Sequence, residues 1–413
     1  MRIERVRALE ILDSRGHPTL QAEVLLSDGT RACAQVPSGA STGRHEALEL
    51  RDGEAARYAG KGVLQAARNV EQVLGPAILG MAAADQAGID RRLIETDGSE
   101  GKAHLGANAT LAVSCAVARA ASACQRLPLW KYLAGARTPR LPVPMVNIIS
   151  GGLHAGQPAP HGSAIEFQDF LVIPRGYRDL STALEAIAHV HRLTGRMLTA
   201  RGQVLTGVAD EGGWGPRLAS NEEAAALLRE AIGAAGATMD IALDVASTHF
   251  FSDGRYHLEG RRLSAAAMMD LLGGWLERHG ITSLEDPLAE DDWEGWKTIT
   301  ERLGRSVRLV GDDLFATNLA RLNRGIHEGV ANSVLVKMNQ IGTLTETFAV
   351  IDRAREAGYG AVISARSGET EDSFLADLAV ASGAGQIKIG SVTRSERLAK
   401  YNRLLEIERW ELV

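Results

Sequence analysis

The chain has 413 residues, 45% of them hydrophobic, and a formal net charge of −6. This length is enough for two or three domains, or for one barrel of about 250 residues beside a smaller domain. The mildly acidic balance gives no reason to expect nucleic acid or an anionic membrane as a partner. The three cysteines lack metal-ligand spacing and residues 1–5 carry no apolar signal region, so we expect buried thiols in a cytoplasmic protein.

Local signals in the first third of the chain predict both strands and helices. Two alternating runs flank the turn sequence at 27–30, which predicts a hairpin with strands over 19–26 and 31–36. Apolar residues then recur at helical spacing over two segments, 63–78 and 108–124.

A proline-rich stretch at 138–144 marks a change in the pattern. We therefore expect an N-terminal α+β domain over residues 1–138 and a catalytic domain over residues 139–413. Beyond this boundary, short apolar runs alternate with helical segments such as 344–356. The runs that predict buried strands lie at 241–244, 283–285, 309–312, 333–337, 361–364 and 386–388.

Repeated strand–helix units predict either a parallel barrel or a doubly wound sheet. Five of the runs end in a charged residue: Asp244, Glu285, Asp312, Lys337 and Lys388. A buried charge at a strand end is costly unless it is paired or binds a metal. Barrel enzymes collect such groups at one mouth, whereas a doubly wound sheet would spread them along an edge. This distribution favours the barrel.

The charged strand ends also indicate a chemistry. Asp244, Glu285 and Asp312 form an all-oxygen ligand set, which suits Mg²⁺ better than zinc. A lysine beside a metal and another cation has a lowered pKa and can act as a base, which suits Lys337 or Lys388. The combination predicts removal of a proton next to a carboxylate, with the metal stabilising the developing charge.

The sequence resembles the enolase family over nearly its full length. The matching motifs occur in the order and spacing of the family, at residues 11–16, 37–43, 106–108, 210–213, 284–287, 311–314, 337–342, 366–372 and 394–402. The resemblance implies a TIM-like barrel whose second strand is antiparallel, with a smaller N-terminal α+β domain that caps it. It further implies a Mg²⁺ cofactor, a small phosphorylated carboxylate substrate, and a homodimer or larger homo-oligomer.

The resemblance also assigns roles in metal binding and proton transfer. Asp244, Glu285 and Asp312 match the ligands of the first magnesium ion. Ser41 matches the ligand of a second ion that arrives with the substrate.

For proton transfer, Lys337 matches the base that removes the C2 proton. Glu211 matches the acid that assists departure of the C3 hydroxyl, and Asp169 belongs to the same acid side. The substrate-binding residues implied by the resemblance are His154, Arg366, Ser367 and Lys388.

Four differences from the family lie in or beside this site. The family has a histidine at Ala365, a glutamate at Asp169 and an asparagine at Ser150, and its loop after His154 is shorter. Loss of one positioned proton-transfer group costs about 10²–10⁴-fold in rate. We therefore predict that the proton-abstracting half of the site is kept and that the leaving-group side is altered.

Three readings of the function remain open. The first is an ordinary glycolytic enolase that interconverts 2-phosphoglycerate and phosphoenolpyruvate, with His249 or His161 in place of the missing histidine. The second is a specialised relative that forms another phospho- or phosphono-enolpyruvate, as carboxyphosphonoenolpyruvate synthases do in phosphonate natural-product biosynthesis. The third is a non-catalytic binding protein. Retention of Lys337, Lys388 and Glu211 argues against the third, because a binding scaffold does not need costly buried charges.

Overall fold

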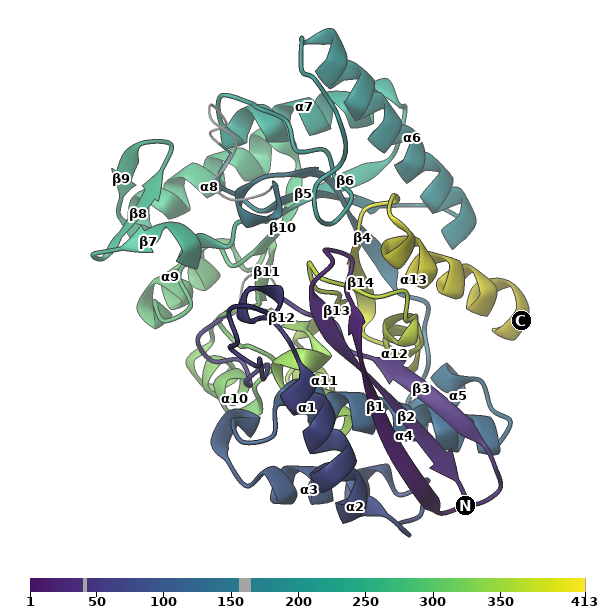
Figure 1. The fold of residues 1–413 in the computed structure, drawn as a ribbon. Coiled ribbons are helices and arrows are strands. Elements are labelled where there is room, and N and C mark those ends of the chain that lie inside the picture. The colour runs from purple at the N-terminus through teal and green to yellow at the C-terminus, as the bar shows by residue number, and fades with distance from the viewer. Residues whose placement is uncertain (40–42, 156–164, 413) are drawn as a thin grey trace.

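The computed structural model describes residues 1–39, 43–155 and 165–412 (Figure 1). Its larger part is a closed eight-stranded barrel. The barrel strands are β4 (Val143–Ser150), β5 (Asp169–Pro174), β6 (Met239–Asp244), β10 (Ile281–Glu285), β11 (Arg308–Gly311), β12 (Ser333–Val336), β13 (Gly360–Ser364) and β14 (Gly385–Gly390). The sequence-based choice of a barrel over a doubly wound sheet is confirmed.

The second barrel strand runs against the others. β5 pairs antiparallel with both β4 and β6, while the remaining neighbours, including β14 and β4, pair in parallel. Because of this reversal, β5 begins at the barrel end where the parallel strands finish. Asp169, its first residue, therefore lies beside Asp244, the last residue of β6.

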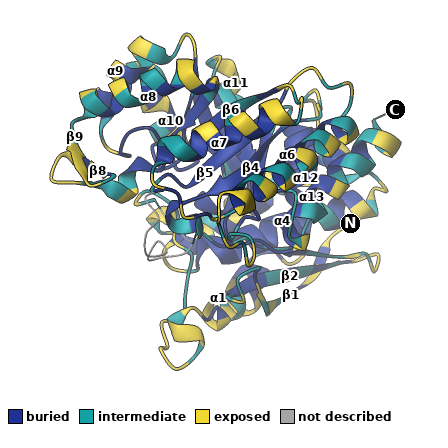
Figure 2. Cartoon of the chain, turned by 90° about the horizontal axis from the view of Figure 1, so that it is seen from above, coloured by how far each residue is buried: buried dark blue, intermediate teal, exposed yellow. Residues whose placement is uncertain are grey.

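Helices cover the outside of the barrel, and all of them except the fully buried α12 (Phe374–Ser382) present an exposed face to solvent (Figure 2). They are α6 (Leu180–Ala200), α7 (Asn221–Ala234), α8 (Ala265–His279), α9 (Trp293–Leu303), α10 (Leu319–Glu328), α11 (Leu344–Glu356), α12 (Phe374–Ser382) and α13 (Ser395–Glu406). Several begin at a side chain that accepts a backbone N–H of the first turn, a favourable start for a helix. These capping residues are Asp179, Ser220, Ser264, Asp292, Asn318 and Thr343. A small sheet of β7 (Phe251–Ser252), β8 (Arg255–Leu258) and β9 (Arg261–Leu263) follows β6.

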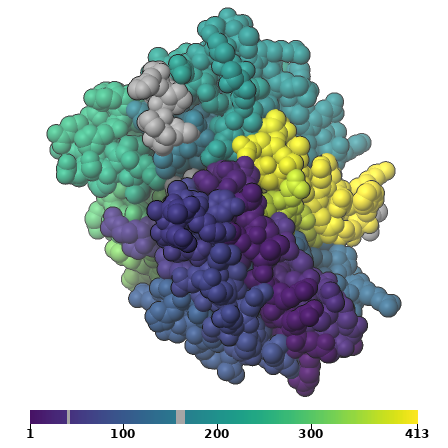
Figure 3. Space-filling model, viewed as in Figure 1, coloured from purple at the N-terminus to yellow at the C-terminus, as the bar shows by residue number. Residues whose placement is uncertain are grey.

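The N-terminal part is an antiparallel sheet packed against helices. Its strands are β1 (Ile3–Leu12), β2 (Pro18–Leu26) and β3 (Arg31–Gln35), and its helices are α1 (Leu64–Asn69), α2 (Gly75–Ile78), α3 (Gln86–Asp97), α4 (Ala107–Cys124) and α5 (Leu129–Ala134). α4 is almost entirely buried, because its alanine-rich surface packs closely against β2 and β3. In the space-filling view, this part lies directly against the C-terminal residues (Figure 3).

Three backbone hydrogen bonds connect the N-terminal part to the segment after β13. Ser38 N–H donates to Gly368 O at 2.7 Å, and Gly368 N–H donates to Ser38 O at 2.9 Å. Ser14 N–H donates to Glu369 O at 2.7 Å. The N-terminal motifs are therefore held at the barrel mouth. Among the described residues, no helix has both the length and the apolar character needed to cross a bilayer.

Candidate active site

Side-chain alternation along the strands fills the barrel with two distinct layers. The lower layer is an apolar cluster of Met145, Leu171, Ile173, Ala242, Val310, Leu335 and Val362, separate from the main core of the molecule. Side chains on one face of a strand repeat every two residues, so the next inward positions lie two residues closer to the mouth. These positions carry polar side chains. They are occupied by Asn147, Asp169, Asp244, Asp312 and Lys337.

Two lysines neutralise the carboxylates at this mouth. Lys388 Nζ donates to Asp244 Oδ2 at 2.7 Å and to the two oxygens of Glu285 at 2.9 and 2.8 Å. Lys337 Nζ donates to Asp312 Oδ2 at 2.5 Å. None of the five side chains is more than 13% exposed. The structure thus gathers all five charged strand ends, although β14 continues two residues past Lys388.

Burial and mutual pairing control the charges of this cluster. Burial raises the pKa of Glu285 well above its usual range, and the adjacent Asp244 carboxylate raises it further. Burial alone would lower the pKa of Lys388, but Asp244 and Glu285 outweigh it and hold that pKa well above its usual value. Asp312 likewise outweighs burial and raises the pKa of Lys337. The lowered Lys337 pKa was expected for a lysine beside a bound metal ion, and it stays a prediction for that state.

A compact acidic group is formed by the residue that follows β10 and by the turn that follows β11. Carboxylate oxygens of Asp286, Asp312 and Asp313 lie within 4.8 Å of one another. Asp286 uses both of its oxygens to accept the backbone N–H groups of Asp312 and Asp313, at 2.9 and 2.8 Å. Burial and the neighbouring Asp312 raise the pKa of Asp313 to about 8. Asp286 therefore orients the turn, and Asp312 carries the negative charge that faces Lys337.

The expected metal ligands have the chemistry that a hard divalent cation requires. Asp244, Glu285 and Asp312 come from the ends of three adjacent strands and offer only carboxylate oxygens. In the described part of the chain, these three do not form one of the groups whose ligand atoms lie within 4.8 Å, and Lys388 contacts two of them.

Opposite the lysines, His154 lies between two carboxylates. It belongs to the short helical turn Gly152–Ala155 that follows β4. Its Nδ1 is 2.9 Å from Asp169 Oδ2, and its Nε2 is 3.8 Å from Glu211 Oε1. The other oxygen of Asp169 accepts hydrogen bonds from Asn147 Nδ2 and from Ser150 Oγ, the latter at 3.3 Å.

The proton on this side of the site resides on the imidazole. Burial alone would lower the pKa of His154, but Asp169 and Glu211 outweigh it and raise that pKa to about 9. Burial alone would raise the pKa of Glu211, yet His154 and Arg397 hold it below its usual value. The result is a protonated histidine that faces an ionised Glu211.

A third group of polar residues lies beyond β13. Arg366 Nη1 is paired with Glu46 Oε2 at 2.8 Å and donates to Asn339 Oδ1 at 3.0 Å. Ser367 Oγ accepts from Arg15 Nη1 at 3.3 Å. Glu46 and Arg15 both come from the N-terminal part, so the two parts of the chain build this side together.

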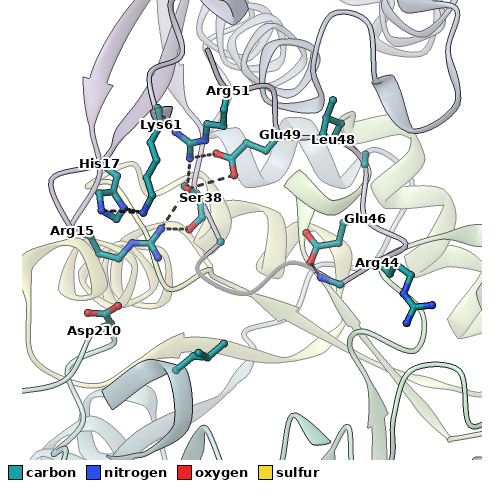
Figure 4. Close-up of a pocket in the computed structure, with 14 residues that line it drawn as sticks. Arg15, His17, Ser38, Arg44, Glu46, Leu48, Glu49, Arg51, Lys61 and Asp210 are labelled. Atoms are coloured by element: carbon teal, nitrogen blue, oxygen red, sulfur yellow. Dashed lines mark hydrogen bonds and ion pairs between the residues drawn. The ribbon is translucent and has the colours of Figure 1, made fainter. Parts of the chain in front are cut away.

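A cleft of about 790 Å³ lies between the N-terminal loops and the barrel (Figure 4). Arg15, Ser38 and Glu49 line one side, and Leu153 and Asp210 come from the barrel. This volume is within the range typical of small-molecule sites.

Comparison with protein families accounts for the whole arrangement. Residues 3–133 match the family described as the enolase N-terminal domain, and residues 138–412 match the enolase C-terminal TIM barrel domain. The chain belongs to the enolase family. It is therefore an enolase-superfamily lyase, and its acidic groups at the barrel mouth are compatible with a metal site.

Two of the four differences from other enolases are in contact with each other. Ser150 and Asp169 are directly opposite on β4 and β5, and their side chains are hydrogen-bonded. Ala365 is buried immediately after β13, and its N–H donates to Lys388 O at 2.8 Å. His249 is exposed in the turn Ser247–Phe250 after β6.

Three of the sequence-based predictions lie outside the described residues. These are Ser41 as a metal ligand, His161 as a substitute for the missing histidine, and most of the longer loop at 155–163.

Sequence reasoning missed several residues that complete the enolase site. Arg15 and Glu46 lie in or next to recognised motifs, but their contacts depend on how the N-terminal part docks onto the barrel. Asn147 had a detectable signal, because it is the one strongly polar residue within the apolar run 143–149. Gln340, which donates to Asp312 Oδ1 at 2.9 Å, lies inside the motif at 337–342.

Proposed function

We propose that this enolase-family lyase depends on Mg²⁺ and removes the C2 proton of 2-phosphoglycerate or a close analogue to form a phospho- or phosphono-enolpyruvate. The observation that carries the proposal is the meeting of Lys337 and Lys388 with three carboxylates at one barrel mouth. Such a set can bind a cation and an anionic substrate and can also accept a proton.

Asp244, Glu285 and Asp312 would hold the first Mg²⁺, and Ser41 a second. Bound Mg²⁺ would supply positive charge that stabilises the negative charge developing on the substrate carboxylate as C2 loses its proton. Lys337 accepts the C2 proton at Nζ once its pairing with Asp312 is weakened. A free amine is needed for this step, and loss of a carboxylate partner lowers a lysine pKa.

Substrate binding is proposed for the residues around the proton-transfer groups. Lys388 binds the substrate carboxylate, while Arg366 and Ser367 bind the phosphoryl or phosphonyl group. Arg366 is paired with Glu46, so substrate must replace part of that contact. Planar guanidinium groups suit this task because they bind phosphate oxygens bidentately.

The leaving-group side is proposed to be modified. Glu211 assists departure of the C3 group, with His154 as the source of the proton and Asp169 as the residue that orients it. Position 365 is an alanine, so the histidine of the family is missing there. The Asp169 carboxylate is already hydrogen-bonded to His154, Asn147 and Ser150. Expulsion of a C3 hydroxyl should therefore be slower than in an ordinary enolase.

Two further proposals concern organisation. We propose domains over residues 1–138 and 139–413, a division supported by the family matches to residues 3–133 and 138–412. Assembly as a homodimer or larger homo-oligomer is proposed from family membership alone.

The test compares two reactions of one substrate. In D₂O with Mg²⁺ and 2-phosphoglycerate, NMR measures C2 proton exchange, while an absorbance assay measures phosphoenolpyruvate. We expect measurable exchange, with phosphoenolpyruvate formed at least about 10²-fold more slowly than by an ordinary enolase measured in parallel. If phosphoenolpyruvate formed as fast as with the ordinary enolase, the proposal of an altered leaving-group side would be excluded and the protein would be an ordinary glycolytic enolase. Absence of exchange would overturn the proposal for this substrate.

A further inference from the structure

Three buried side chains form a closed hydrogen-bonded ring at the ends of β4 and β5. Asn147 Nδ2 donates both to Ser150 Oγ, at 2.8 Å, and to Asp169 Oδ1. The Ser150 hydroxyl in turn donates to the same Asp169 oxygen at 3.3 Å. The hydroxyl thus acts as acceptor and donor at once, and one carboxylate oxygen receives two donors.

Among the described residues, the second oxygen of Asp169 contacts only His154. Asp169 Oδ2 lies 2.9 Å from His154 Nδ1, and the opposite ring nitrogen faces Glu211. Asp169 is fully buried, with 0% of its side chain exposed, so no solvent competes for either oxygen. The direction in which the imidazole points therefore depends on how the carboxylate is held.

The surroundings allow the ring little freedom. A Cβ at Gly213 would lie 2.7 Å from Asn147 Oδ1 and 2.9 Å from Ser150 Oγ, closer than such contacts tolerate. Ser150 N–H donates to Trp214 O at 2.8 Å, which fixes the strand backbone beside the ring. A reversed Asn147 amide would turn its oxygen toward the Asp169 carboxylate, so the observed orientation is strongly preferred.

We propose that Ser150 and Asn147 are positioning residues that hold the short Asp169 carboxylate so that it aims His154 at Glu211. In this proposal Ser150 and Asp169 are a matched pair. A glutamate at position 169 would carry its carboxylate about 1.5 Å farther from the backbone, past the Ser150 hydroxyl. An asparagine at position 150 would place its N–H donor closer to the carboxylate of such a glutamate. The two differences from the family, Ser150 in place of asparagine and Asp169 in place of glutamate, are then one coupled change on the leaving-group side. Its catalytic consequence rests on the proposed function.

A double-mutant cycle tests the coupling. Ser150→Asn and Asp169→Glu should each lower product formation about 10-fold or more, because the carboxylate and its donor no longer match. The double variant should lose clearly less than the product of the two single losses. C2 proton exchange, which depends on Lys337, should fall much less than product formation in all variants. Losses that multiply to within about twofold, or exchange that falls in parallel with product, would overturn the matched pair.

A second readout does not require turnover. Ring ¹⁵N NMR of labelled histidine, with the His154 signals assigned from His154→Gln, reports how that imidazole is bound and protonated. Ser150→Ala should shift the His154 signals. The matched control is Ser333→Ala, because Ser333 is an equally buried serine at the start of β12, at the far end of the barrel.

The two readouts separate the proposals. If wild-type protein shows no C2 exchange, the proposed function fails, but a His154 shift confined to Ser150→Ala still supports the positioning role. Unchanged His154 signals in Ser150→Ala, in a protein that unfolds at the wild-type temperature, would overturn the positioning role.

Discussion

Replacement of Lys388 by methionine should expose how strongly the buried carboxylates need a positive charge. The ammonium contacts Asp244 and Glu285 at 2.7–2.9 Å, and all three side chains are at most 5% exposed. Removal of one partner from a buried ion pair costs about 3–5 kcal/mol, because the other charge is left uncompensated. We therefore expect Lys388→Met to lower the free energy of unfolding by about that amount in EDTA.

Mg²⁺ should offset much of this loss. A ligand at 100 times its dissociation constant stabilises the folded state by about 2.7 kcal/mol. The ion should stabilise the variant more than the wild type, in which the Lys388 ammonium competes for the same oxygens. The difference between the two proteins should therefore shrink in excess Mg²⁺ by the amount by which the ion stabilises the variant more than the wild type, which is at most about 2.7 kcal/mol at this saturation.

The loss should also depend on pH. Burial already raises the pKa of Glu285 above 4.5, and loss of the lysine raises it further. An acid whose pKa is raised by folding favours the folded state below its unfolded pKa, and this contribution disappears as the pH rises through the folded pKa. The deficit of Lys388→Met in EDTA should be smallest near pH 4.5 and should grow toward neutrality.

Urea and thermal unfolding, followed by circular dichroism, measure these differences. Lys400→Met is a matched control, because Lys400 is a fully buried lysine whose Nζ is paired with Glu369 at 2.9 Å, away from the proposed ligands. It should be destabilised without recovery in Mg²⁺. Equal stability of Lys388→Met and wild type in EDTA, or equal recovery of both variants by Mg²⁺, would refute the reasoning.

Three further predictions concern the reaction. Asp312→Ala should fold but lose Mg²⁺ binding by titration calorimetry, and wild-type activity should vanish in EDTA; full activity in the chelator would exclude the metal assignment. Glu211→Gln should still exchange the C2 proton by NMR but should form at least about 10²-fold less product, whereas Lys337→Ala should lose both; equal loss of exchange in both would mean that the roles are assigned wrongly. Ala365→His combined with Ser150→Asn and Asp169→Glu should recover part of the phosphoenolpyruvate formation in the absorbance assay, and no gain would argue against a role for these three positions.

Much of the barrel could be predicted, because parallel strands buried on both faces leave continuous apolar runs. The segment 344–356 is the helix Leu344–Glu356 as expected, and the strand ends are within two residues of the predictions. β1 and the antiparallel β5 had no comparable local signal. β5 was expected only through the family resemblance, since its direction depends on pairing with β4 and β6. The predicted helix over 63–78 is interrupted by a π-helical turn, Val70–Leu74.

Part of the candidate site could also be predicted from the sequence, and part could not. The charged strand ends were predictable because a buried charge stands out in an apolar run. Their pairing, such as that of Lys337 with Asp312, was not, because it depends on which strands are neighbours in the closed barrel. The contact between Ser150 and Asp169 was equally invisible, because it depends on the register of β4 against β5.

The most direct test of the account is the fate of the C2 proton. Wild-type protein is incubated in D₂O with 2-phosphoglycerate, with Mg²⁺ or with EDTA, and the C2–H signal is followed by NMR beside the Lys337→Ala variant. The signal should decay only for wild type with Mg²⁺, because proton removal needs both the lysine and the metal. Decay that persists in Lys337→Ala, or in EDTA, would contradict it.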